Sequence, residues 1–246
     1  MTDRNKQFIA ATPMLLFLLA QIVLFPLIQF TPGGVSGNMS YLAIIIVALF
    51  ALFACKCTGT AHFIRFGIFA TLAADYFLII AEDAQLEGVL CFIVVQLLYC
   101  FYLIFSESRI GVCTFNTTLR IALSVLLVVF AFALLGEDTD TLSIVSVIYY
   151  ANLISNIVFA FMLGKGNRLF AVGLVLFAMC DLCIGMQVLS EDYLDNNALS
   201  FFYSDMLNLP WVFYQPSQVL IALSLFFKKH KKQEGTVKSG LFVYSP

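Results

Sequence analysis

Long apolar segments alternate with short polar breaks along almost the whole chain. A helix needs roughly 17 to 25 predominantly apolar residues to cross the ~30 Å hydrocarbon core of a bilayer. The pattern therefore predicts an all-α, polytopic membrane protein with about eight transmembrane helices. The predicted spans are residues 8–30, 41–57, 63–81, 88–105, 119–135, 142–163, 169–189 and 207–227.

The composition agrees with this prediction, because 61% of the 246 residues are hydrophobic and only 11% are charged. A soluble domain could not cover so many apolar side chains with polar surface. The first span follows Arg4 and Lys6 as in a signal peptide, but no small-residue cleavage site is evident, so we expect it to be retained. We expect one transmembrane domain, residues 1–228, followed by a basic cytoplasmic tail, residues 229–246.

The basic residues predict an orientation. Lys and Arg are enriched in cytoplasmic loops, and when successive spans alternate in direction all 13 of them fall on one side. The sequence therefore predicts an integral, multi-pass protein of the cell (plasma) membrane with both termini in the cytoplasm. The residues on this side are Arg4, Lys6, Lys56, Arg65, Arg109, Arg120, Lys165, Arg168, Lys228, Lys229, Lys231, Lys232 and Lys238.

The loops predicted on the opposite side carry acidic residues and no basic ones. Acidic side chains contribute little to orientation, so we expect these to be solvated loop ends and assign them no chemistry. They are Glu82, Asp83, Glu87, Glu137, Asp138, Asp140, Glu191, Asp192, Asp195 and Asp205.

Two of the predicted spans share one arrangement of residues. Gly67 lies eight residues before Asp75, and Gly173 lies eight residues before Asp181, with an offset of 106 residues between the pairs. Parallel repeats occur in membrane transport folds, whereas apolar helices also resemble one another by composition alone, so both explanations stay open. A repeat would divide the chain into two parallel four-helix halves, residues 1–108 and 109–228.

Asp75 and Asp181 are the two acidic residues that fall well inside a predicted span. They lie about 15 and 20 Å along their helices from Arg65 and Arg168. An aspartate near mid-membrane costs about 2.5 to 3.5 kcal/mol, so the presence of two favours a function. The structural alternative is that each one locks neighbouring helices through hydrogen bonds worth ~0.6 to 2 kcal/mol.

Two buried carboxyls are suited to acid–base chemistry. When they lie within a few ångströms they tend to share one proton, which leaves one group to donate a proton and another to activate water. No metal is predicted, because His62 and His230 lie at the membrane boundary. Cys180 and Cys183 have a ligand-like spacing, but on a helix we expect them to pack in the core.

Amide and phenol groups within the spans are candidates for substrate binding. Tyr149, Asn152 and Asn156 share one helix face by their spacings of three and seven residues. Each such group is also explained by a hydrogen bond between helices. The predicted substrate-binding residues are Gln96, Tyr99, Tyr214, Gln218, Asn152 and Asn156.

Short motifs carry a resemblance to a known family. In the third and fourth spans they are Gly67, Asp75, Tyr76, Phe77, Leu78, Gly88, Phe92, Gln96, Leu97, Leu98 and Tyr99. In the seventh and eighth spans they are Gly173, Phe177, Asp181, Tyr214, Gln218, Val219, Leu220 and Ile221. Over roughly residues 60–225 these positions resemble the YhhN-like lysoplasmalogenases. The sequence departs from the family pattern at Gln96, where many members have His.

The resemblance implies an eight-helix hydrolase that cleaves the vinyl ether bond of a lysoplasmalogen into a fatty aldehyde and a glycerophospho-alcohol. Asp75 and Asp181 match the family's aspartates. Carboxyl groups suit this reaction because protonating the enol ether gives an oxocarbenium ion, as in glycoside hydrolysis. The implied partners are a lysophospholipid-like substrate and membrane lipids, and no cofactor is implied.

Other functions would use the same two aspartates. A proton-coupled transporter would cycle a proton on one of them as its halves rock, and a lipid-binding membrane protein would hold an amphiphile beside them. A structural or receptor-like bundle would tolerate replacement of both aspartates by asparagine. No nucleic-acid partner is predicted.

Overall fold

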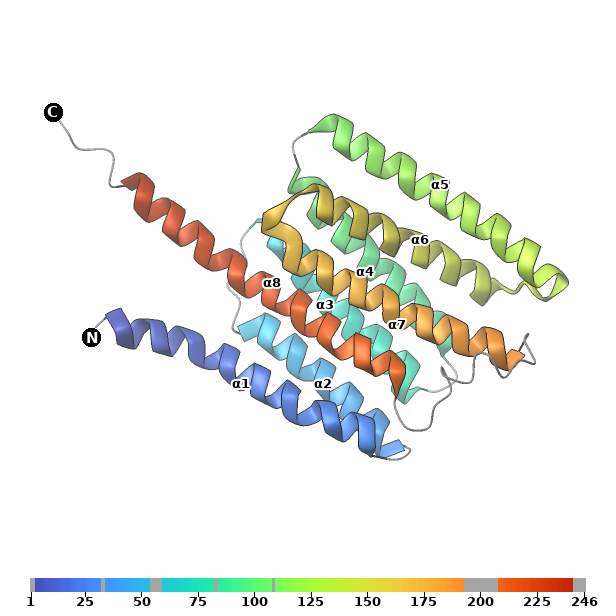
Figure 1. Cartoon of the computed structure of the whole chain (residues 1–246), viewed down its shortest axis with the longest axis horizontal. Helices are drawn as coiled ribbons and strands as arrows, with labels where there is room; N and C mark the ends of the chain where they lie inside the picture. The colour runs from blue at the N-terminus through green and yellow to red at the C-terminus, as the bar shows by residue number, and fades with distance from the viewer. Residues whose placement is uncertain are drawn as a thin grey trace.

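A computed structural model of the protein describes residues 3–31, 34–53, 59–81, 84–107, 109–192 and 208–240. Within these residues every regular element is helical and no strand occurs, which confirms the all-α prediction. The elements are α1 (Asp3–Phe30), α2 (Gly34–Phe53), α3 (Ala61–Asp75), η1 (Tyr76–Ile80), α4 (Gln85–Phe105), α5 (Ile110–Leu135), η2 (Gly136–Asp138), α6 (Thr141–Met162), η3 (Lys165–Asn167), α7 (Arg168–Asp192) and α8 (Leu209–Gly240) (Figure 1).

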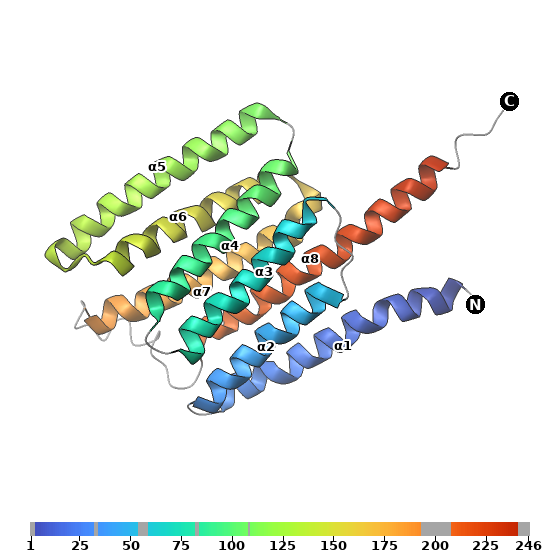
Figure 2. The same cartoon turned by 180° about the vertical axis from the view of Figure 1, so that it is seen from behind.

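Successive long helices run in opposite directions, so both termini lie at the same end of the bundle (Figure 1). Six helices form a ring of neighbours, in which α2 packs on α3, α3 on α4, α4 on α6, α6 on α7, α7 on α8, and α8 on α2. The outer helices are α1, against α2 and α8, and α5, against α6 (Figure 2). Each half of the chain thus contributes one outer helix and three ring helices, an arrangement consistent with two parallel four-helix halves.

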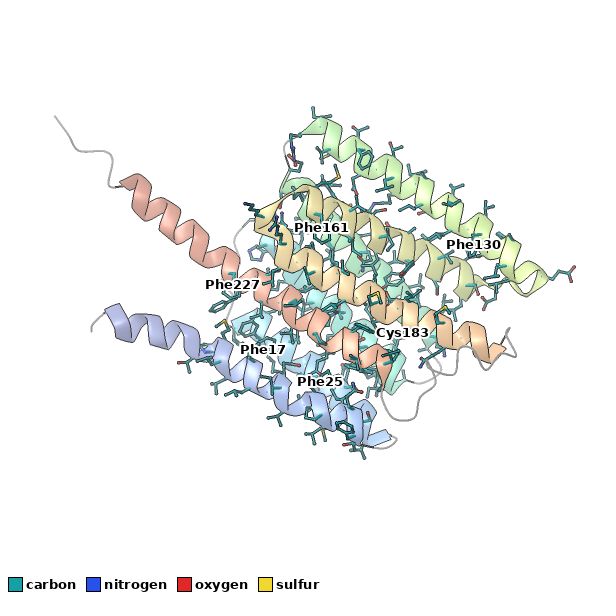
Figure 3. All side chains as sticks on the ribbon, in the orientation of Figure 1. Phe17, Phe25, Phe130, Phe161, Cys183 and Phe227 are labelled. Carbon is teal, nitrogen blue, oxygen red and sulfur yellow. The ribbon has the colours of Figure 1, made fainter. Side chains whose placement is uncertain are left out.

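Seven of the described helices are long and apolar enough to cross a membrane. α8 is not among them, because its first half carries Gln215, Ser217 and Gln218, whose side chains are buried inside the bundle. The outer surface is apolar, and Phe130 and Phe161, which are 59% and 48% exposed, belong to it (Figure 3). Since water would disfavour such a surface, lipid is its natural solvent. The protein is a polytopic, all-α membrane protein.

Basic residues gather at the end of the bundle where the termini lie, and we call this the basic end. It is formed by the beginning of α3 with Arg65, the α4–α5 connection with Arg109, and the α6–α7 turn with Lys165 and Arg168. The opposite end, where η2 joins α5 to α6, carries Glu137 and Asp140. This distribution follows from the alternating helix directions that the sequence predicts.

Most helix boundaries lie close to the predicted spans, but α1 and α2 begin five and seven residues before residues 8 and 41, and α5 begins earlier still. It starts at Ile110, nine residues before the predicted start at residue 119. The prediction was wrong because the polar run before residue 119 was interpreted as a break, whereas it is helical and its Asn116 packs inward. Arg120 consequently lies in the third turn of α5.

Several predicted features lie outside the described residues. The backbone of α8 continues as a helix to Gly240, through the first part of the predicted tail. The structure does not describe the side chains of the following residues named in the sequence analysis: Arg4, Lys6, Lys56, Glu82, Asp83, Asp138, Glu191, Asp192, Asp195, Asp205, Lys228, Lys229, His230, Lys231, Lys232 and Lys238.

Two glycines at equivalent positions allow close helix packing. Gly67 of α3 lies against the ring of Tyr99 of α4, where an added Cβ would overlap the ring. Gly173 of α7 faces α8, and a Cβ there would lie 2.8 Å from Ile221 and 3.1 Å from the carbonyl oxygen of Ser217. Each glycine precedes the aspartate of its helix by eight residues. The close contacts of α3 with α4 and of α7 with α8 therefore lie at the same distance along the helix from Asp75 and from Asp181.

Candidate functional site

Asp75 is the last residue of α3, and only 3% of it is exposed. The hydroxyl of Tyr214 on α8 donates a hydrogen bond to this carboxyl and lies 2.7 Å from both of its oxygens. A buried carboxyl without a partner would be costly, and the tyrosine removes part of that cost. The bond also joins the two halves of the chain, since α3 belongs to the first and α8 to the second.

The backbone changes its helical geometry directly after Asp75. Residues Tyr76–Ile80 form the π-helical turn η1, which ends with a bond from the N–H of Ala81 to the carbonyl of Tyr76. Gly88 of α4 makes room for this wider turn, because a Cβ there would lie 2.6 Å from Leu78. Such turns are rare and are frequently found at functional sites. The sequence pattern did not predict this one, since a π turn has no distinct apolar period.

Asp181 lies in the middle of α7 and is partly buried. The hydroxyl of Tyr149 on α6 donates a hydrogen bond to its Oδ2 at 2.6 Å. Each aspartate is therefore paired with a tyrosine from a helix other than its own. Tyr149 was not among the predicted substrate-binding residues, and the signal that pointed to it was its shared face with Asn152 and Asn156.

Aromatic rings connect the two aspartate–tyrosine pairs. The ring of Phe177 on α7 lies 5.4 Å from that of Tyr214 and 6.5 Å from that of Tyr149, edge-on to both. The ring of Phe92 on α4 lies 5.3 Å from Phe177 and 5.7 Å from Tyr149. The aspartates of α3 and α7 thus belong to one site with an aromatic wall.

A polar network lies beside this site and contains three of the predicted substrate-binding residues. The amide nitrogen of Asn156 donates to the side-chain oxygen and to the backbone oxygen of Gln96, at 2.9 Å each. The amide oxygen of Asn156 accepts a bond of 2.8 Å from Arg120. Arg120 also donates to the amide oxygen of Asn152. The sequence interpretation used Arg120 only as a topology signal, because it placed this residue at the very start of the predicted span 119–135.

The remaining predicted binding residues, Tyr99 and Gln218, are both buried. The hydroxyl of Tyr99 lies beside that of Thr71, one turn before Asp75. Gln218 follows Tyr214 by one turn on α8 and is fully buried. Among the described residues, its side-chain oxygen has no hydrogen-bond partner, and neither does the buried amide nitrogen of Gln96. Buried polar atoms of this kind usually bind water or a ligand.

In the described part of the chain, no three His, Cys, Asp or Glu side chains come together in a way that could hold a metal ion. Cys180 and Cys183 are 4% and 3% exposed, which confirms that they pack in the core. That the site needs no metal or cofactor stays a prediction.

The arrangement is suited to proton transfer to an apolar ligand. Carboxyls donate or accept protons, and the hydroxyls that bind them hold their oxygens in fixed positions. Aromatic rings around them keep the surroundings dry, where electrostatic interactions are stronger than in water. The rings of the aromatic wall are buried among the helices, and the unpartnered amides offer contacts for a polar group.

The fold and the site together define a class of protein, a polytopic all-α membrane protein with two aspartates held inside its helix bundle. The sequence profile of the YhhN family matches residues 38–225. The chain belongs to the YhhN family, as its motifs predicted. Searches of the curated proteins and of the solved structures gave no match.

Proposed function

We propose that the protein is a membrane-embedded hydrolase that cleaves the vinyl ether bond of a lysoplasmalogen, with Asp75 and Asp181 as its general acid and base. The observation that carries the proposal is the union of these two carboxyls, from different halves of the chain, in one aromatic-walled site. Each carboxyl has its own tyrosine partner, so the two are held separately and not as one hydrogen-bonded pair.

The reaction needs only these groups and one water. One aspartic acid gives its proton to the double-bond carbon that carries the hydrocarbon chain, and the carbon bonded to oxygen becomes an oxocarbenium ion. The other aspartate, as a carboxylate, takes a proton from water while the water oxygen bonds to that carbon. In the resulting hemiacetal the bond to the glycerol oxygen breaks, and the hydroxyl proton moves to that oxygen. The products are a fatty aldehyde and a glycerophospho-alcohol.

The proposed setting is the cell membrane, with the basic end of the bundle and both termini in the cytoplasm. The support is the enrichment of Lys and Arg on cytoplasmic loops together with the position of Arg65, Arg109, Lys165 and Arg168 at one end. The substrate is a lysophospholipid that enters from the bilayer.

The test is aldehyde release from a lysoplasmalogen by the purified protein in detergent. We expect Asp75→Asn and Asp181→Asn each to lower the rate by about 10²- to 10⁴-fold, the usual contribution of a general acid or base. Glu87→Gln, at an exposed position in the first turn of α4, is the matched control and should leave the rate unchanged. The saturated ether analogue should not be cleaved, because it has no double bond to protonate.

If well-folded protein cleaved no lysoplasmalogen with any of several headgroups, the proposed hydrolase activity would be contradicted.

The second candidate function is that of a proton-coupled transporter. It is supported by the ring of helices, to which each half of the chain contributes three, since repeats of this kind move against each other in transporters. In liposomes such a protein would carry a proton flux that either asparagine variant abolishes. A lipid-binding protein would bind lysolipid in the same vesicles without flux or turnover.

A further inference from the structure

Arg120 is a cation within a membrane-spanning helix. It lies ten residues after the start of α5, or about 15 Å along the helix, and is partly buried. Its guanidinium points to α6, where it donates to the amide oxygens of Asn152 and Asn156. No carboxylate of the described residues forms an ion pair with it. The charge is therefore oriented by two neutral groups and is not neutralised.

An arginine in a membrane-spanning helix is unusual when, as among the described residues here, it has no acidic partner. Charged side chains in spanning helices are costly and are commonly paired with an opposite charge or with a functional ligand. A guanidinium has five N–H donors in a planar fork, and the two bonds to asparagine leave donors available. That fork matches the oxygens of a phosphate, which it binds through parallel bonds. Arg120 thus has the charge, the donors and the fixed orientation that recognition of a phosphate requires.

A cavity of about 570 Å³ lies between the end of α4 and the first turns of α5 at the basic end. Thr117 and Cys113 line it, at three and seven residues before Arg120, and so share its helix face. The cavity therefore borders the face of α5 that carries Arg120 and ends one turn before this residue.

Asn116 is a further group that fits an anionic ligand with a polar head, and the acidic residue of the cavity is paired with a cation. Asn116 precedes Arg120 by one turn, is 1% exposed, and has no hydrogen-bond partner for either polar atom of its side chain within the described residues. Glu107 lines the cavity and would repel an anion, but its carboxylate forms an ion pair of 2.6 Å with Arg109. The negative charge of Glu107 at the cavity wall is therefore balanced by Arg109.

We propose that Arg120, supported by Asn116 and the α4–α5 cavity, binds the phosphate of a lysophospholipid, with the headgroup in the cavity. This inference rests on the proposed function and specifies how the substrate is held. Tyr149, the partner of Asp181, lies three residues from Asn152 on α6, about 5 Å along the helix. A phosphate on Arg120 consequently places the glycerol and its vinyl ether in reach of the aspartates.

The experiment measures binding, not turnover, so that it is independent of the hydrolase. The ligand is a lysophosphocholine with a saturated ether chain, and its partner is the 1-O-alkylglycerol of the same chain, which lacks the phosphate. In a maltoside detergent we expect the protein to bind the phosphate-bearing ligand at least tenfold more tightly. Arg120→Gln should abolish that preference and leave the affinity for the alkylglycerol unchanged. Arg168→Gln, at an exposed position of the same end, should preserve the preference.

Three outcomes would overturn the proposal. These are equal binding of both ligands by the unmodified protein, an unchanged preference in Arg120→Gln, and displacement of the lysolipid by millimolar inorganic phosphate, which would indicate a soluble anion as the ligand. If Arg120→Gln does not fold, Arg120→Lys keeps the charge but loses the fork and should reduce the preference. Phosphate-dependent binding without aldehyde release would support the Arg120 site and contradict the hydrolase activity. Aldehyde release that does not depend on Arg120 would support the hydrolase activity and contradict the Arg120 site.

Discussion

The hydroxyl of Tyr214 bridges both oxygens of Asp75, at 2.7 Å from each, across the contact between α3 and α8. This is the shortest polar link that the described residues make between the aspartate of the first half and a helix of the second. One donor placed between two oxygens does not favour either of them. It therefore fixes the plane of the carboxyl while leaving each oxygen free to exchange a proton with a ligand.

Replacing Tyr214 by Phe tests this bond. The ring keeps its edge-on contact with Phe177, whereas Asp75 loses its donor. Hydrogen bonds to charged groups contribute about 1.5 to 3 kcal/mol, so we expect kcat/KM for aldehyde release to fall by about 10- to 100-fold. Tyr150→Phe is the matched control, because the hydroxyl of Tyr150 lies 3.4 Å from the carbonyl of Ala178 and makes only a weak bond. Equal rates in the two variants would contradict the assigned role.

Gly173 tests the packing that positions Asp181. In Gly173→Ala the new methyl meets Ile221 and the backbone of α8 at distances that require a shift of the helices. Overpacking of this kind destabilises by about 1 to 3 kcal/mol, and we expect a lower midpoint of thermal unfolding in detergent. Gly185→Ala lies on the same helix, has nothing within 4 Å of its added methyl, and should gain about 0.5 to 1 kcal/mol from helix propensity. If the two variants had the same midpoint of thermal unfolding, the packing of α7 against α8 at Gly173 would not be tight.

The sequence predicted the helices and the two aspartates because these depend on local properties. Apolar runs of sufficient length identify spans, and Asp75 and Asp181 are conspicuous as acids inside them. The partners of these acids depend on how helices are rotated against each other, and the apolar pattern does not determine that rotation when a helix is apolar all round. Tyr149 was therefore noted for its helix face without its link to Asp181. The contacts of Arg120 with Asn152 and Asn156 were missed for a different reason, because the polar residues before residue 119 were interpreted as a break between spans.

Gln96 tests the network that connects α4, α6 and α5. Gln96→Met keeps the length of the side chain but removes the oxygen that accepts from Asn156. Asn156 retains its bond to the backbone oxygen of residue 96, so we expect a loss of only about 1 kcal/mol in unfolding free energy, at the low end for a buried donor. Gln96→His restores an acceptor and should lose less than Gln96→Met. If Gln96→His lost more unfolding free energy than Gln96→Met, the shape of the side chain at this position would matter more than its hydrogen-bond acceptor.

Asp140 offers a prediction about pH at a position outside the membrane spans. It is the N-cap of α6, and its Oδ1 accepts a hydrogen bond of 2.8 Å from the N–H of Ser143. The bonds from Ser143 lower the pKa of Asp140 from its ordinary value of 3.8. A lowered pKa means that the folded state favours the carboxylate, so this stabilisation is complete above pH 3.8 and is lost as the pH falls through the lower pKa of the folded protein.

We therefore expect Asp140→Ala to reduce the unfolding free energy at pH 7 by about 0.5 to 1 kcal/mol, the lower part of the range for N-caps, because the residue is exposed. The difference from the unmodified protein should shrink below pH 3.8, where the carboxyl becomes protonated. Asp140→Asn keeps a side-chain oxygen for Ser143 but has no proton to gain. Its stability relative to Asp140→Ala should consequently not vary with pH, and thermal unfolding of the three proteins between pH 3 and pH 7 measures this. A pH-dependent gap between the Asn and Ala variants would place the titrating group elsewhere in the protein.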